Sequence, residues 1–173
     1  MGKKTDRKGR EVHYGQTPTA ALGVTDQHSQ LQLFIEGPND KSYLFWAVRE
    51  FRNSMKIEHP YSSFDSMGYL QGANMAGLFD AERRATEIAI TEAGRPNATV
   101  YVDRIDEESL GDLIMFSQYM TAYAGELYDI NAFDQPGVEY GKKLTFAMMG
   151  RAGFDTFNGK IEAERRKERA IVR

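Results

Sequence analysis

The sequence predicts an α/β fold with parallel strands, followed by C-terminal helices. Apolar stretches rich in aromatic and β-branched residues alternate with stretches of helical period, in the order helix, strand, helix, strand, helix, helix. The first strand stretch, Ser42 to Phe51 (SYLFWAVREF), is mostly apolar, as expected of a strand buried in a parallel sheet. Two strands are too few for a complete doubly wound domain, so we expect further strands from elsewhere.

Composition describes a globular protein and excludes several classes of function. The 173 residues are 41% apolar and 27% charged, and the formal net charge of −3 gives no global basic field for nucleic acid. The chain has no cysteine, which excludes disulfides and cysteine-ligated zinc and favours a reducing compartment, with the cytoplasm as the expected location. Because no apolar run approaches the roughly 20 residues of a membrane span, we expect no membrane partner.

The N-terminal part of the chain is predicted to start without regular structure. Residues 1–19 are rich in Lys, Arg and Gly and lack an apolar period, so we expect an exposed arm or loop. A helix is predicted from Asp26, and Gly37 followed by Pro38 is typical of its end. Residues 52–68 have no clear period and are predicted to form a loop.

A second strand lies between two long predicted helices. Residues 75–92 keep a 3.6-residue apolar period, and Gly94 supplies the stop. The run ATVYVDR at Ala98 to Arg104 is predicted to be a strand. Asp106 is suited to cap the following helix, which should continue to about Tyr128.

The C-terminal part is predicted to be helical. Pro136 fits the first turn of a helix that continues to about Gly150, and Lys160 to Arg173 form a highly charged terminal helix. This divides the chain into an arm or loop (1–19), one main domain portion (20–158) and a charged C-terminal helix (159–173).

Gln135 and Lys142 are the first candidate site residues. They stand seven residues apart, so a helix beginning at Pro136 places an amide and an ammonium two turns apart on nearly the same face. Each taken alone is also an ordinary helix-start or solvated side chain. Glu139 lies three residues before Lys142 and has two interpretations, an ion pair within the helix or a contact with substrate; we favour a supporting role.

His28 is the candidate for proton transfer. Imidazole as a side-chain type titrates near neutrality, which suits such a transfer. His28 lies in the first turn of a predicted helix, where a capping or surface role is the alternative. His13 and His59 lie in predicted loops without metal-binding spacing. We therefore expect neither a metal site nor a cofactor.

Two motifs resemble known segments of the glucose-6-phosphate isomerase family. The run GELYDINAFDQPGVEYGK at Gly125 to Lys142 resembles the family's C-terminal signature, in which Phe-Asp-Gln precedes Gly-Val-Glu and then a lysine. The run GVTDQHSQ at Gly23 to Gln30, continued by LFIEGPNDK at Leu33 to Lys41, resembles the histidine segment of bacterial members. The motifs occur in the family's order, and with the runs GRPN and SLGDLI they cover nearly the whole chain.

The resemblance implies an aldose-ketose isomerase that interconverts glucose 6-phosphate and fructose 6-phosphate. His28 would open the sugar ring, Lys142 would assist there or steady developing oxyanion charge, and Gln135 would contact the sugar phosphate. The implied fold is a three-layer αβα domain of sugar-isomerase (SIS) type, the second in the family protein. The resemblance also implies a homodimer of the full-length protein, in which the matching histidine reaches the partner's site.

Two functional parts of the family have no match in this sequence. The family's catalytic base is a glutamate in a Glu-Ser-x-Gly-Lys run; Gly2-Lys3 resembles its end, which puts the glutamate just before Met1. The Ser/Thr-rich phosphate loop also has no counterpart. We therefore expect a C-terminal portion of the isomerase that is inactive or nearly so alone. The alternatives are another sugar-phosphate isomerase, which the Phe133 to Lys142 signature disfavours, and a non-catalytic sugar-phosphate-binding or assembly module derived from the isomerase.

Overall fold

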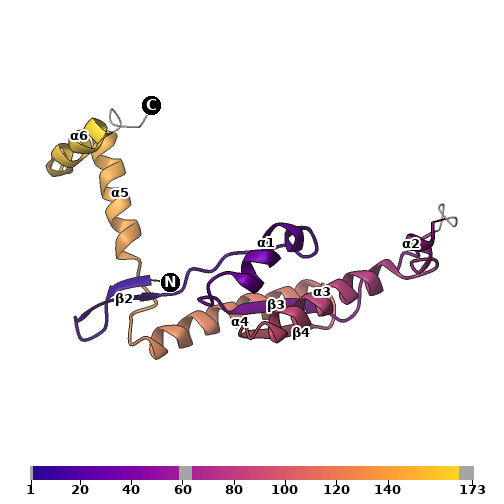
Figure 1. The fold of residues 1–173 in the computed structure, drawn as a ribbon. Helices are drawn as coiled ribbons and strands as arrows, with labels where there is room; N and C mark the ends of the chain where they lie inside the picture. The colour runs from indigo at the N-terminus through magenta and orange to yellow at the C-terminus, as the bar shows by residue number, and fades with distance from the viewer. Residues whose placement is uncertain (1, 59–63, 168–173) are drawn as a thin grey trace. The chain divides into compact units, whose positions relative to one another are not determined.

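A computed structural model describes residues 2–58 and 64–167, which fall into two compact units (Figure 1). The first comprises Gln16–Met120, and the second joins Met1–Gly15 to Thr121–Arg173. Helix α4, Glu107–Leu127, belongs in part to each unit. The predicted division at residues 19 and 158 into domain portions remains a prediction.

The unit Gln16–Met120 contains the predicted parallel sheet. Strands β3 (Tyr43–Val48) and β4 (Asn97–Val102) pair in parallel, with Tyr43 opposite Asn97 and Val48 opposite Val102. Helix α3, Met75–Glu92, connects them, as in a βαβ crossover. The α/β class with parallel strands is therefore confirmed, whereas the three-layer SIS-type domain stays a prediction.

Local sequence signals account for the ends of α3 and α4. The Asn74 side chain accepts a hydrogen bond from the N–H of Ala76 at 2.9 Å and caps α3, and Gly94, at φ +68°, follows its end. At the start of α4, Asp106 accepts from the N–H of Ser109 at 2.9 Å, which confirms the predicted cap. These caps satisfy N–H groups that the first turn of a helix leaves unpaired.

A short helix lies where the sequence predicts only loop. Within residues 52–68, α2 spans Asp65–Gly68, and Lys56 forms an isolated bridge to Asn74. Four residues make about one helical turn, too short to produce the apolar period by which longer helices are recognised. His59 lies outside the described residues.

The second unit corrects the expectation for residues 1–19. Strands β1 (Gly2–Thr5) and β2 (Glu11–Gly15) form an antiparallel hairpin instead of an arm or loop. The turn is built around Asp6, whose carboxylate accepts from the N–H groups of Lys8 and Arg10 at 2.9 Å each. Most hairpin side chains are exposed, so the strands carry no apolar alternation by which to recognise them.

Helices complete this unit. Helix α5 spans Pro136–Met148, the short 3₁₀ helix η1 spans Asp155–Phe157, and α6 spans Asn158–Lys167. Helix α6 overlaps the first part of the charged terminal helix predicted for 159–173, and residues 168–173 lie outside the described residues. At the end of α4, a Cβ on Gly125 would come within 2.7 Å of the Ala132 Cβ, so this close approach requires glycine.

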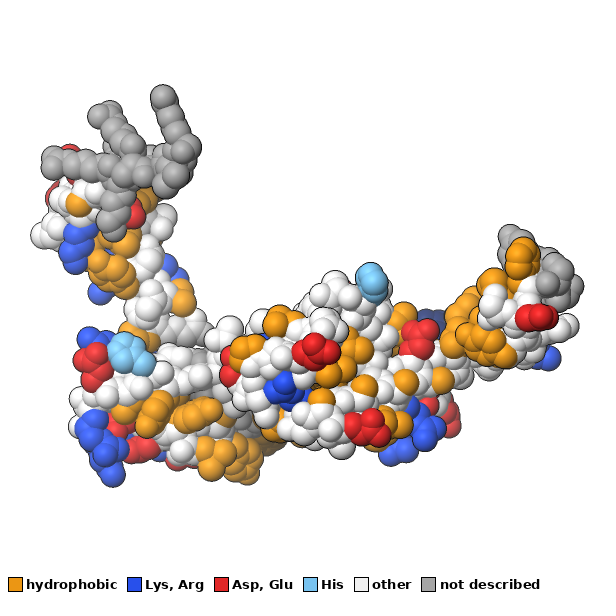
Figure 2. Space-filling view, viewed as in Figure 1, with side chains coloured by type: hydrophobic (Ala, Val, Ile, Leu, Met, Phe, Trp, Pro, Cys, Tyr) orange, Lys and Arg blue, Asp and Glu red, His pale blue; other side chains and the backbone are white. Residues whose placement is uncertain are grey.

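Much apolar surface is open to solvent (Figure 2). The buried apolar residues are few across the described chain: Ala47, Ile90, Ile130 and Ala147. Along α4, by contrast, large apolar side chains are exposed, among them Ile114, Tyr123 and Leu127. In the part of the chain that the structure describes, no helix is long and apolar enough to cross a bilayer.

Candidate functional site

The start of helix α5 carries Gln135, the first of the two candidate residues associated with this helix. Pro136 lies in its first turn, as predicted, where the missing N–H costs no helical hydrogen bond. Gln135 occupies the N-cap position, but its side chain makes no capping hydrogen bond. The Gln135 amide is therefore not used to close the helix end and can donate to and accept from a hydroxyl group.

Lys142 lies two turns further along α5 and pairs with Glu139. The Lys142 Nζ and a Glu139 carboxylate oxygen are 2.7 Å apart, and the two side chains are 57% and 60% exposed. The hydrogen bond from Lys142, followed by its charge, lowers the pKa of Glu139 below its ordinary value of 4.5. Of the two interpretations of Glu139, the structure shows the ion pair. A pair this exposed is weak, so an anionic ligand can compete for the ammonium.

His28 lies in the first turn of α1, Thr25–Glu36, as predicted, and its side chain is exposed. The turn before it is closed by Asp26, whose carboxylate accepts from the N–H of Leu22 at 2.6 Å. Ser29 donates back to the carbonyl of Asp26 at 3.1 Å. The neighbours of His28 thus support the backbone of the first turn, and its imidazole is accessible to a ligand.

Several side-chain contacts hold α1 against the rest of its unit. The guanidinium of Arg95 donates to the carbonyls of Ile35 and Gly37 at 2.5 and 2.7 Å, which satisfies groups at the C-terminal end of the helix. Near the other end, the Gln27 amide donates to the Thr86 hydroxyl at 2.7 Å. The Phe34 and Tyr43 rings also pack together, with centroids 4.9 Å apart. These contacts give His28 a fixed place relative to α3 and β3.

The three predicted site residues divide between the two units. Gln135, Glu139 and Lys142 lie together on α5 in the second unit, whereas His28 belongs to Gln16–Met120. The structure therefore places the amide and the ammonium on one helix and defines the position of His28 within its own unit.

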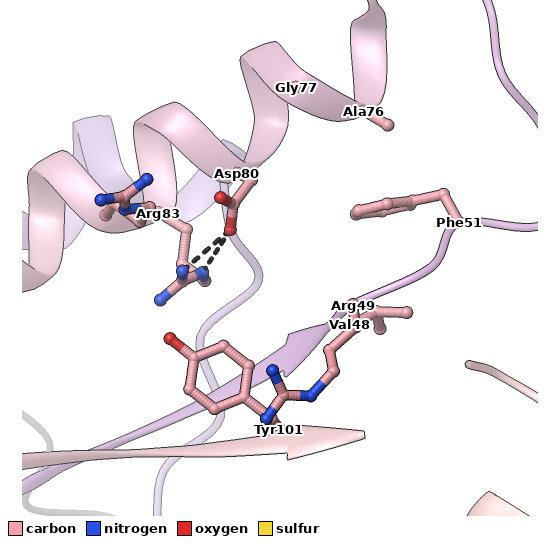
Figure 3. Close-up of a pocket in the computed structure, with 9 residues that line it drawn as sticks. Val48, Arg49, Phe51, Ala76, Gly77, Asp80, Arg83 and Tyr101 are labelled. Atoms are coloured by element: carbon pink, nitrogen blue, oxygen red, sulfur yellow. Dashed lines mark hydrogen bonds and ion pairs between the residues drawn. The ribbon is translucent and has the colours of Figure 1, made fainter. Parts of the chain in front are cut away.

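Sequence reasoning missed an arginine–tyrosine cluster in an open cavity of about 550 Å³ (Figure 3). The cavity lies where β3 and β4 end, beside the first half of α3. The guanidinium carbons of Arg49 and Arg83 lie 4.6 and 5.5 Å from the centre of the Tyr101 ring. Arg83 also pairs with Asp80 at 2.8 Å and Glu87 at 2.7 Å. Because these carboxylates already neutralise Arg83, the cluster fits a structural role that joins α3 to the sheet.

The spacing of Asp80, Arg83 and Glu87 is a sequence signal for the ion-paired part of this cluster, although not for its contact with Tyr101. Residues three and four apart share a helix face, so a central arginine with two acidic neighbours is expected to pair within the helix. Metal binding has no comparable support, because the described residues contain no group of three or more His, Asp or Glu side chains suited to a metal ion.

A model of the family described as phosphoglucose isomerase matches residues 1–155. The chain belongs to the phosphoglucose isomerase family. A glucose-6-phosphate isomerase from Carboxydothermus hydrogenoformans is 44% identical over 172 residues, covering 99% of this chain and 37% of the relative. A second, from Rubrobacter xylanophilus, is 47% identical over 140 residues, covering 81% of this chain and 32% of the relative.

A solved structure supports the fold. The crystal structure of a hypothetical protein from Thermus thermophilus is 38% identical, with a TM-score of 0.75, and covers 87% of this chain and 35% of that one. This chain of the phosphoglucose isomerase family thus spans about a third of the length of the curated relatives that it matches.

Proposed function

We propose that this chain is the C-terminal portion of a glucose-6-phosphate isomerase, which interconverts glucose 6-phosphate and fructose 6-phosphate. One observation carries the proposal: the family-matching segment places an uncommitted Gln135 amide at the start of α5 and an exposed Lys142 ammonium two turns later. The relatives named glucose-6-phosphate isomerase support the substrate class.

The reaction assigns each residue a role. Aldose-ketose isomerisation requires a proton to move between the ring oxygen and O1, and then between C1 and C2 through an enediol. His28 suits the first transfer because an imidazole nitrogen can donate or accept a proton. The Lys142 ammonium assists ring opening or stabilises developing oxyanion charge, and the Gln135 amide hydrogen-bonds the sugar phosphate. The ammonium leaves its weak pair with Glu139 to do so.

The catalytic base and the phosphate-binding loop are supplied from outside this chain. No residue here matches the family's glutamate base or its Ser/Thr-rich phosphate loop, so the chain alone is inactive or nearly so. The full-length protein is a cytoplasmic homodimer that needs no cofactor. The exposed apolar side chains of α4 support association with further protein surface.

The test uses a fusion enzyme in which this chain replaces the segment that it matches in the Carboxydothermus relative. We expect the fusion enzyme to isomerise fructose 6-phosphate at a rate close to that of the relative, and the chain alone to show no activity above background. His28→Asn should lower the kcat of the fusion enzyme by about 10² or more, as for loss of a general acid or base. His13→Asn, on the exposed hairpin, is the matched control.

Cooperative thermal unfolding of the fusion enzyme establishes that it is folded. A folded fusion enzyme without isomerase activity would contradict the proposed reaction. Activity without any loss in His28→Asn would contradict the proposed role of His28. An inactive fusion enzyme that still binds fructose 6-phosphate would favour the non-catalytic sugar-phosphate-binding module.

A further inference from the structure

Lys3 on β1 has an unusually buried ammonium side chain. Its side chain is 9% exposed, whereas the side chain of the next residue, Lys4, is 67% exposed. Successive side chains of a strand point to opposite faces, which accounts for the contrast. Burial of a charged group costs free energy unless the group is paired. The partners of the Lys3 ammonium therefore indicate its structural role.

Both partner atoms of Lys3 belong to one residue. The Nζ donates to the carboxylate of Asp134 and also to the main-chain carbonyl of Asp134, the latter at 2.5 Å. That carbonyl is part of the peptide bond that joins Asp134 to Gln135. Lys3 therefore holds both the side chain and the backbone directly before the proposed substrate-binding amide.

The hairpin that carries Lys3 is itself attached to the same segment. The N–H of Arg7 donates to the carbonyl of Asp129 at 2.8 Å, and its guanidinium donates to Glu126 at 2.7 Å. The Tyr14 and Tyr128 rings pack with centroids 5.8 Å apart. Since the hairpin is fixed at several points, Lys3 acts from a rigid support.

The Gln135 carbonyl is held by the first turn of α5, where it accepts from the N–H groups of Val138 and Glu139, but its side chain has few other restraints. Asn131 accepts from the N–H of Phe133 at 3.0 Å and shapes the turn, and Pro136 starts the helix. The Gln135 side chain does not cap the helix, so the helix end does not set its orientation. The two hydrogen bonds from Lys3 to Asp134, which we call the Lys3 clamp, form the contact next to Gln135 that comes from a distant part of the sequence.

We propose that Lys3 is a positioning residue, which holds Gln135 where its amide meets a hydroxyl group of the sugar phosphate. The inference rests on the proposed function of Gln135. Lys3 does not itself touch substrate; it acts through the backbone of Asp134. Its loss should weaken substrate binding without preventing folding, because the Asp134 carboxylate is 58% exposed and can be solvated without its partner.

The first test needs no substrate and uses the 173-residue chain. Nuclear magnetic resonance spectra of ¹⁵N-labelled chain report the side-chain amide and backbone N–H of Gln135. Lys3→Met keeps the length of the side chain and removes its charge, and Lys4→Met is the matched control on the opposite face of β1. We expect the Gln135 signals to move in Lys3→Met only. Equal spectra in both variants would overturn the role of Lys3.

The second test separates positioning from general stability. In the fusion enzyme, Lys3→Met should raise KM for fructose 6-phosphate about tenfold with kcat nearly unchanged. This is the pattern expected when binding of the substrate and of the transition state is weakened equally. If Lys3 acts through Gln135, then Lys3→Met should change KM less than about twofold in a Gln135→Ala background. A tenfold effect in both backgrounds would overturn the inference. Full activity of Gln135→Ala alone would instead contradict the proposed function of Gln135.

Discussion

At the residue scale, carboxylates fix the local turns. Asp6 accepts from two backbone N–H groups and from the Arg10 Nε at 2.6 Å, and so closes the β1–β2 turn. Burial acts to raise the pKa of Asp6, but hydrogen bonds from Arg10 and Lys8 outweigh it and lower the pKa below its ordinary value of 3.8. The hairpin is therefore stabilised by the ionised form of Asp6.

This pKa shift gives the hairpin a defined pH dependence. A lowered pKa in the folded state means that the stabilisation is fully present above the unfolded pKa and is lost as pH falls through the folded pKa. We expect hydrogen-exchange protection of β1 and β2 to fall as pH drops below about 3.8, the ordinary value for aspartate. Asp6→Asn should lower that protection already at about pH 6, whereas Glu11→Gln, on an exposed side chain, should change it little. Unchanged protection in Asp6→Asn would contradict this account.

At the element scale, long-range side-chain contacts place helices that the sequence predicts one at a time. The sequence predicts α1, α3, α4 and α5 because each carries a period, a cap or a proline signal. It does not predict that Arg95, just after α3, closes the end of α1, because nothing local relates residues 60 positions apart. The β1–β2 hairpin is not predicted for a related reason. It is held by the hydrogen bonds of Asp6 in its turn and by the contact of Arg7 with Glu126 of α4, and not by alternating apolar side chains.

The Arg95 contact predicts a specific effect on α1. Arg95→Met removes two charge-assisted hydrogen bonds to the carbonyls of Ile35 and Gly37. We expect α1 to lose about 1.5 to 3 kcal/mol of local stability, measured as faster amide exchange across residues 25–36. Arg104→Met is the control, because the pair of the exposed Arg104 side chain with Asp106 lies outside α1 and should leave amide exchange across residues 25–36 unchanged. Equal exchange in the two variants would rule out the anchoring role.

At the scale of the whole molecule, sequence motifs identify the family, and the structure gives the local surroundings of each candidate site residue. The order of the motifs predicts that nearly the whole chain belongs to the glucose-6-phosphate isomerase family. The family match over residues 1–155 confirms this prediction. The pairing of Lys142 with Glu139 follows from helical spacing. The Lys3 clamp on Asp134 does not, because the two residues are 131 positions apart and β1 carries no strand signal. The exposed apolar side chains of α4 are seen only in the folded chain, because no single sequence motif shows which side chains are left uncovered.

The most direct test of the central claim compares two adjacent lysines in the fusion enzyme. Lys142 and Lys143 are both exposed on α5, but only Lys142 lies two turns from Gln135 on nearly the same face. We predict that Lys142→Met lowers kcat/KM for fructose 6-phosphate by about 10² or more, as for loss of a group that stabilises transition-state charge. Lys143→Met should stay within about twofold of the unmodified fusion enzyme. Equal activities of the two variants would contradict the account.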